Sequence, residues 1–584
     1  MSGSSGGALR RLFQVLAALL ALTLVATACG SDSDDADTGA DNGGTEAPDE
    51  EVDTGTEDEV TETTLPQQDV EVATTEAGTT INRGGTLTVV LEAETDTWNI
   101  PAAACAVSCI TIMQQVADPL TIVNSDGEVE PFLAESVDIS DDFTTYTIKL
   151  REGITFHNGS PANADAMVRH FQAMAAGTLQ GQVMTDILGT AEAGYLDGGM
   201  EIIDDLTISI TFGKPYATFG YNIAGRTGWL MAPEFWDSET VASDTPIATG
   251  AFEMTEWTID EQTVLTANAN YWRTDADGEA LPYLEEIVVR PVPDVSARQA
   301  IMEAGDAQVN ADSFAENGDF WENEWEGGNL QPSEREVTYL LLNNAEGSPF
   351  ANPDVRKAIA QCTDRDEYIA LRAPGNELAN GPFAPEALGF LDESTFPEFD
   401  PEAGATLLAS TGVTAISYGT TNVPSNLITA ELFADMWSQN CGIEVNIDQF
   451  DQSELITRAI TGNFEVFLWR NHGQGNPGLE YVWWNSRHAS GLALNFGRII
   501  DPELDALLEQ TWQTSDLDEL DSLGQDISRL FGDNVYNIWL GHTEWNLPFQ
   551  ANVNGVGNID TPSGNKANPS FAGRMWLTQA WISQ

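Results

Sequence analysis

The segment 145–150 alternates polar and apolar residues, and its apolar positions are Tyr146, Ile148 and Leu150. A period of two along the chain predicts a β-strand with one buried face. Gly153 follows closely, and glycine most readily adopts the backbone conformations of a tight turn. The pattern therefore predicts a half-buried strand that ends in a turn.

An amphipathic helix is predicted beyond a second turn at Asn158-Gly159. Asn163 can cap the helix N-terminus, and Asp165 lies in the first turn, where the helix dipole favours a carboxylate. The apolar side chains that follow recur on one helical face, at Met167, Val168, Phe171 and Met174. Strands followed by a helix indicate a mixed α/β architecture.

About 500 residues follow position 83, and this body is long for a single hydrophobic core. Cores stop growing at roughly 250–300 residues, beyond which chains divide into separate units. We therefore expect the body to contain at least two lobes.

Residues 1–29 are expected to form an export signal. Arg10 and Arg11 supply positive charge, residues 12–28 are apolar, and small residues precede Cys29. The apolar run is slightly short for a membrane span. The end of this segment, VATACG, resembles a bacterial lipobox, although leucine is more usual where Ala26 stands, so Cys29 is expected to carry a lipid. The alternative is an ordinary signal peptide cut elsewhere, which would leave Cys29 without lipid.

Residues 30–83 are expected to form a disordered acidic tether. Between positions 31 and 80 the chain has 17 Asp or Glu, no Lys or Arg, and few large apolar residues. Such a segment cannot bury enough apolar surface to offset the entropy lost on ordering. We interpret it as a leash between the export signal and the body.

The whole chain is strongly acidic, with 92 Asp or Glu against 23 Lys or Arg and a formal net charge of −69. A field of this sign repels phosphates and argues against nucleic acid as a partner. The charge is either a solvated surface suited to a saline habitat or a means of steering cationic solutes. Its spread over the body and the tether favours the first interpretation.

A longer pattern surrounds the first predicted strand and helix, and residues 133–174 read LAESVDISDDFTTYTIKLREGITFHNGSPANADAMVRHFQAM. This stretch resembles the signature of the family 5 extracellular solute-binding proteins of bacterial ABC importers, which bind peptides, nickel or oligosaccharides. Shorter matches to the same family extend the resemblance from Gly84 towards the C-terminus, at Gly84–Val90, Thr249–Phe252, Ala267–Trp272, Pro293–Arg298, Asp354–Ile359 and Gly442–Val445.

The resemblance implies an α/β, two-lobed, periplasmic-binding-protein-like fold (type II, large cluster C kind) with a hinge and an interlobe ligand cleft. It implies lobe I at 84–330, with an inserted subdomain at about 121–235, then lobe II at 331–545 and a return to lobe I at 546–584. The implied partners are a peptide or other small-molecule solute, ABC permease subunits, and the membrane through a lipid anchor. We expect a monomer without a cofactor.

The implied function is that of a lipid-anchored extracytoplasmic receptor. It would capture an oligopeptide-like or other small polar solute and pass it to a permease, without acting as an enzyme. The alternatives are an oligosaccharide receptor of the same family and a secreted hydrolase or ligand sensor on the same fold. Beyond the expected export signal, the sequence contains no Gly-x-Ser-x-Gly elbow, His-Glu-x-x-His motif or Walker loop, which disfavours the hydrolase.

Five cysteines occur, and assigning one to lipid leaves Cys105, Cys109, Cys362 and Cys441. Outside the cytoplasm an even number indicates two disulfides, for which three pairings exist. Cys105 and Cys109 are close enough in sequence to bridge locally, so 105–109 with 362–441 is the favoured pairing. A Cys-x3-Cys metal site is the alternative, but no histidine lies nearby to complete it, and we expect no metal.

Ligand-binding candidates are concentrated in residues 464–484, FEVFLWRNHGQGNPGLEYVWW, a predicted buried strand followed by a polar loop. In the family this strand and loop contribute to the interlobe pocket. Aromatic platforms and polar donors suit sugars and extended peptides equally. The alternative for the tryptophans is a position in the hydrophobic core. For Trp469 the pocket and the core are equally favoured, whereas for one of Trp483 and Trp484 the core is favoured. The candidates are Trp98, Arg226, Trp229, Trp469, Arg470, Asn471, His472, Trp483, Trp484 and Trp545.

Peptide-binding members of the family commonly hold the α-amino group of the ligand with an Asp in this loop. Residues 469–479 read WRNHGQGNPGL and contain no carboxylate. A buried ammonium without a carboxylate partner is strongly disfavoured. We therefore expect N-acetylated peptides or glycans to bind at least as well as free peptides, unless Glu480 or Glu544 reaches the cleft from elsewhere.

Overall fold

The computed structural model describes residues 81–103, 105–176, 199–332, 335–471, 475–568 and 573–583, and these lie in one compact unit. The predicted export signal, the predicted lipidation site at Cys29 and nearly all of the predicted tether lie outside the described residues. Within the described ranges, no helix is both long enough and apolar enough to cross a membrane.

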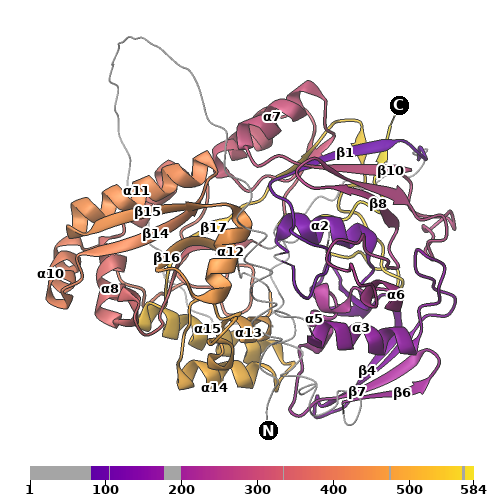
Figure 1. Ribbon diagram of the computed structural model, residues 1–584, viewed down its shortest axis with the longest axis horizontal. Coiled ribbons are helices and arrows are strands. Elements are labelled where there is room, and N and C mark those ends of the chain that lie inside the picture. Colours follow the sequence, from indigo (N-terminus) through magenta and orange to yellow (C-terminus); the bar gives the residue numbers. More distant parts are fainter. Residues whose placement is uncertain are drawn as a thin grey trace, which may run out of the picture. The chain divides into compact units, whose positions relative to one another are not determined.

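A seven-stranded sheet is built around β1 (Thr86–Leu91), whose side chains Leu87 and Val89 are fully buried (Figure 1). β1 pairs in parallel with β10 on one side and with β11 on the other. The strand order is β12-β18-β11-β1-β10-β9-β8. The remaining strands are β8 (Phe252–Thr258), β9 (Gln262–Ala267), β10 (Glu286–Pro291), β11 (Val309–Asn310), β12 (Gly328–Leu330) and β18 (Leu547–Phe549).

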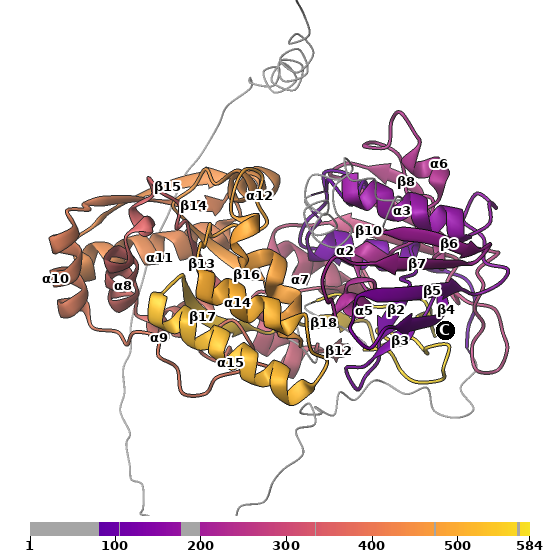
Figure 2. The same cartoon turned by 90° about the horizontal axis from the view of Figure 1, so that it is seen from below.

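The predicted half-buried strand is β5 (Thr145–Leu150), and its alternation of buried and partly buried residues confirms the period of two. The predicted helix is α3 (Ala164–Ala176), whose first turn is capped by a hydrogen bond from the Ala166 amide to the Asn163 side chain. β5 belongs to a four-stranded antiparallel sheet, and α3 packs against β6 and β7 of that sheet (Figure 2). The other strands are β4 (Ala134–Ile139), β6 (Met200–Asp204) and β7 (Thr207–Thr211).

A five-stranded sheet contains β13 (Glu336–Leu342) and β17 (Asn537–Thr543), in each of which all seven residues are buried. Such uniform burial requires cover on both faces of the sheet. The strand order is β15-β14-β16-β13-β17, with α11 packed against β14 and β15. The other members are β14 (Ala415–Thr421), β15 (Glu444–Phe450), β16 (Val466–Asn471) and the helix α11 (Pro424–Cys441).

Aspartate side chains cap many of the helices, so part of the acidic surplus has a local structural role. Each accepts a hydrogen bond from a backbone amide of the first turn, which satisfies one of the donors that a helix leaves unpaired. These helices and their caps are α7 (Val295–Ala304, Asp294), α9 (Arg365–Arg372, Asp364), α10 (Pro401–Thr411, Asp400), α12 (Gln452–Thr461, Asp451), α14 (Pro502–Thr511, Asp501) and α15 (Leu517–Asn534, Asp516).

The remaining elements are short or connect the sheets. Two small antiparallel ribbons pair β2 with β3 and β19 with β20. The ribbons and connecting helices are β2 (Thr121–Val123), β3 (Val129–Pro131), β19 (Val553–Asn554), β20 (Trp581–Ile582), α2 (Val107–Val116), α5 (Phe219–Asn222), η2 (Arg226–Gly228), α6 (Pro233–Trp236), η3 (Ala315–Asn317), η4 (Phe320–Glu324), η5 (Pro349–Ala351), α8 (Pro353–Cys362), η6 (Pro477–Glu480), α13 (Tyr481–Trp484) and η7 (Ser486–His488).

The chain passes between the two larger sheets twice. It leaves the seven-stranded sheet after β12 and enters the five-stranded sheet at β13, then returns between β17 and β18. The structure also joins Cys105 to Cys109 and Cys362 to Cys441. The first disulfide closes a short loop at the start of α2, and the second connects the ends of α8 and α11.

Candidate functional site

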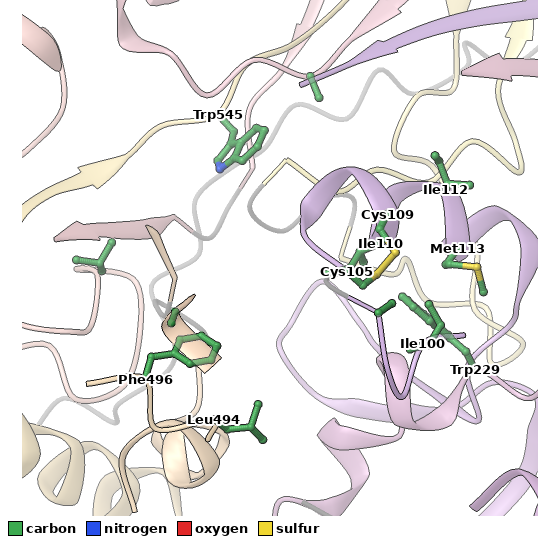
Figure 3. Close-up of a cluster of buried hydrophobic side chains, with 14 of the residues drawn as sticks. Ile100, Cys105, Cys109, Ile110, Ile112, Met113, Trp229, Leu494, Phe496 and Trp545 are labelled. Atoms are coloured by element: carbon green, nitrogen blue, oxygen red, sulfur yellow. A yellow bond between two sulfur atoms is a disulfide. The ribbon is translucent and has the colours of Figure 1, made fainter. Parts of the chain in front are cut away.

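A cavity of about 340 Å³ lies between elements of the seven-stranded and five-stranded sheets. Its size is within the range of pockets that bind small molecules. On one side it is bordered by Glu92 after β1 and by Cys105 and Ile110 at the start of α2; on the other it is bordered by Leu494 and Phe496. Figure 3 shows Cys105 and Ile110 on one side of this region and Leu494 and Phe496 on the other.

Aromatic rings form part of the cavity wall. Trp469 on β16 and Trp483 on α13 both line the cavity, and both are partly exposed. Phe496 joins them, with ring centroids 5.3 Å from Trp469 and 5.4 Å from Trp483. Flat apolar faces of this kind pack against sugar rings, peptide planes or apolar side chains.

Arg470 connects the two sheets across the cavity. Its guanidinium forms an ion pair of 3.3 Å with Glu92, which follows β1, and another of 3.2 Å with Glu336 on β13. It also donates a hydrogen bond to the Ser313 hydroxyl and lies 4.8 Å from the centroid of the Trp545 ring. The side chain is therefore held on several sides by protein groups.

The two carboxylates beside Arg470 differ in their acidity. Burial opposes the ionisation of Glu92 most strongly, but the positive charges of Arg470 and Arg298 and hydrogen bonds from Ser313 leave its pKa below the usual value. Burial raises the pKa of Glu336, and Arg470 opposes this only in part. Glu92 is thus firmly ionised, whereas the charge of Glu336 depends on Arg470.

A second set of contacts joins the same two parts of the molecule. Arg372 on α9 forms an ion pair of 2.5 Å with Glu316 on η3. The Ser425 hydroxyl at the start of α11 donates a hydrogen bond of 2.8 Å to Glu316, and Arg372 donates one of 2.9 Å to Thr429. Arg372, Ser425 and Thr429 all line the cavity.

The sequence candidates fall into two groups in the structure. Arg226, Trp469, Arg470 and Trp483 line the cavity. Four tryptophans are instead buried in the core and are not among the lining residues: Trp98, Trp229, Trp484 and Trp545. The Trp545 ring nevertheless contacts the lining residue Arg470. Asn471 is the last residue of β16, and His472 lies outside the described residues.

Sequence reasoning missed the two carboxylates of the cavity, Glu92 and Glu336. The sequence of the loop after β16 contains no carboxylate, but other parts of the chain supply two carboxylates to the cavity. Neither Glu480 nor Glu544, the two acidic residues anticipated as substitutes, is among its lining residues. The expectation that the solute needs no α-amino group therefore rests on the loop alone, and it stays a prediction.

Among the described residues, no group of three or more His, Cys, Asp or Glu side chains is arranged to hold a metal ion. The cavity lining offers aromatic faces, guanidinium donors, hydroxyl groups and carboxylates for contact with a solute.

A comparison with known families defines the class of protein to which this cavity belongs. The model of the bacterial extracellular solute-binding proteins, family 5, matches residues 128–491. The chain belongs to this family, whose members are the extracytoplasmic binding proteins of ABC importers.

Curated relatives share about a quarter of their residues with the chain. It is 25% identical over 445 residues to di/tripeptide-binding protein 2 of Pseudomonas aeruginosa, which covers 71% of this chain and 81% of that protein. It is also 25% identical over 484 residues to heme-binding protein A of Haemophilus influenzae, and the match covers 75% of this chain and 83% of that protein.

Solved structures confirm the predicted fold class. The periplasmic binding protein DppA of Helicobacter pylori, in complex with the peptide STSA, matches with a TM-score of 0.75 at 21% identity, covering 86% of this chain and 99% of that one. The murein tripeptide binding protein MppA of Escherichia coli matches with a TM-score of 0.74 at 18% identity, covering 87% of this chain and 100% of that one.

Proposed function

We propose that the cavity captures an oligopeptide-like solute, which the protein delivers unaltered to the permease of an ABC importer. The observation that carries this proposal is a cavity bordered by both large sheets and lined by Trp469, Trp483 and arginine side chains. The relatives named for di- and tripeptides support the same class of solute. The aromatic wall also suits a sugar, so an oligosaccharide is the second candidate.

Solute release requires that the cavity open, and we propose that the two crossings between β12 and β13 and between β17 and β18 act as the hinge. Lobe I would then comprise residues 84–330 and 546–584, and lobe II residues 331–545. Hinges are commonly a few residues at the ends of elements. A solute that contacts both lobes would stabilise the closed state.

Native mass spectrometry tests the proposed function. The body of the protein, residues 81–584, is freed of retained solute by partial unfolding and refolding, and then mixed with a library of tri- and tetrapeptides. We expect one peptide bound per protein, recovered with unchanged mass. Recovery of cleaved peptides would indicate a hydrolase, and the absence of any bound peptide would exclude an oligopeptide receptor.

Lipid attachment at Cys29 is proposed as the membrane anchor, since a single acyl-bearing cysteine before a long polar segment suits a tethered receptor. Cys29→Ser is expected to move the protein from the membrane fraction to the soluble fraction and to leave solute affinity unchanged. Fractionation after an alkaline wash, with immunodetection, measures this. A variant that stays in the washed membranes would show that another segment anchors the chain.

A further inference from the structure

The segment at the start of α2 forms much of one wall of the cavity. A disulfide joins Cys105 to Cys109 within this segment, with their Cα atoms 5.2 Å apart. Figure 3 shows this disulfide on the opposite side of the region from Leu494 and Phe496. A covalent cross-link is therefore built into a wall of the cavity. The residues of the segment that line the cavity are Ala103, Cys105, Ala106, Val107, Ser108 and Ile110.

Side-chain contacts do little to hold this wall in place. Residues 101–106 read PAAACA, and each alanine offers only one methyl group for packing. The N-cap residue of α2 is Ala106, and within the described residues no side chain caps this helix. Other helices of the protein have an aspartate in that position to bind a free backbone amide. The disulfide instead ties the chain that enters α2 to Cys109 in its first turn.

The same segment also supports the charged side of the cavity. The Ser108 hydroxyl accepts a hydrogen bond of 3.3 Å from the Ala93 amide. Ala93 directly follows Glu92, whose carboxylate is paired with Arg470. Both Glu92 and Ala93 line the cavity. A displacement of Ser108 would therefore disturb the position of Glu92 as well.

We propose that the Cys105–Cys109 disulfide is a positioning element of the solute site, which holds the wall at 103–110 in the shape that a bound solute contacts. This inference rests on the proposed function, because it assumes that the cavity holds the solute. A wall that is fixed before binding loses less conformational entropy when the solute packs against it. Opening this disulfide should therefore weaken solute binding.

The other disulfide of the structure is a matched control. Cys362 and Cys441 connect the ends of α8 and α11, and neither residue is among the lining residues of the cavity. Their bond closes a loop with a sequence separation of 79, against 4 for the bond between Cys105 and Cys109. The long loop should matter more for stability, whereas only the short loop should matter for solute affinity.

Calorimetry on two double variants tests this division. The probe is the peptide that native mass spectrometry recovers in the largest amount from the tri- and tetrapeptide library. Cys105→Ser, Cys109→Ser should bind this peptide about tenfold more weakly than the wild type. Cys362→Ser, Cys441→Ser should bind it within about twofold of the wild type, as expected for a change distant from the site. Circular dichroism checks that both variants are folded.

Reduction of the wild type provides a readout that a purely structural cross-link would not change. Dithiothreitol opens a disulfide by thiolate attack on a sulfur atom, so the rate depends on access to that atom. The protein is incubated with dithiothreitol with and without saturating peptide, quenched with iodoacetamide and mapped by mass spectrometry. The peptide should slow reduction between Cys105 and Cys109, and should leave the rate between Cys362 and Cys441 unchanged.

The outcomes distinguish the inference from the proposed function. Wild-type affinity in Cys105→Ser, Cys109→Ser, or a reduction rate at that bond that the peptide does not change, overturns the positioning role but leaves the peptide receptor intact. Equal effects at both disulfides, in either experiment, would indicate a general effect on the fold and also overturn the role. If Cys105→Ser, Cys109→Ser does not fold, the reduction rates of the wild type decide alone. Failure of the wild type to bind any peptide overturns the proposed function, and the inference with it.

Discussion

Arg470→Ala is expected to lower the free energy of unfolding by about 3 kcal/mol, because it leaves Glu336 buried beside Glu92 without the arginine between them. The Arg470 side chain is 30% exposed, so the lower end of the range for a buried ion pair applies. The substitution also removes the contact between the guanidinium and the Trp545 ring. Urea denaturation followed by tryptophan fluorescence measures the loss.

The stability lost in Arg470→Ala should depend on pH, because burial raises the pKa of Glu336 above its ordinary value of 4.5. Without Arg470 that pKa rises further. A carboxyl group that binds its proton more tightly in the folded state contributes stability that is fully present below the unfolded pKa and is lost as the pH rises through the folded pKa. The destabilisation of Arg470→Ala should therefore be smaller at pH 5 than at pH 7.5.

Arg458→Ala is the matched control. Arg458 pairs with Glu454 one turn away on α12, and the Glu454 side chain is 47% exposed. Such surface pairs contribute less than about 1 kcal/mol. Equal losses in the two variants, or a loss in Arg470→Ala that does not change with pH, would contradict the role assigned to the Arg470 ion pairs.

Removal of the disulfide between Cys362 and Cys441 should cost about 4.5 kcal/mol of unfolding free energy. The two cysteines are 79 residues apart, and a cross-link that closes a long loop removes much of the entropy of the unfolded chain. The double variant Cys362→Ser, Cys441→Ser, studied by urea denaturation without reductant, measures the effect.

The other disulfide provides the comparison, since Cys105 and Cys109 are only 4 residues apart. The same relation gives about 2 kcal/mol for the double variant Cys105→Ser, Cys109→Ser. A larger loss for this short loop than for the long one would contradict an entropic origin of the stabilisation.

Local patterns in the sequence were sufficient for a few of the elements. The alternation at 145–150 and the cap at Asn163 predicted β5 and the start of α3, because both features involve neighbours in the chain. The fold class followed from the family resemblance.

The electrostatics of the cavity could not be predicted in this way. Arg470 and Glu92 are 378 positions apart and meet only because two different sheets place them together. Arg470 was a candidate from the sequence, but the many carboxylates of this chain hide its two partners, Glu92 and Glu336.

The tryptophans illustrate the same limit. Trp483 and Trp484 are adjacent, yet Trp483 lines the cavity whereas Trp484 is 2% exposed and packs against Phe531, with ring centroids 4.6 Å apart. Neighbours on a short helix point in different directions, and composition alone does not indicate which one faces the solute.

A crystal structure of the protein saturated with its best-binding peptide tests the central claim most directly. The account predicts density for one peptide in the cavity, in contact with the aromatic rings of Trp469 and Trp483. Density for the peptide at another place, such as the polar pocket beside Ser417 and Asp448, with the main cavity free of it, would contradict the account.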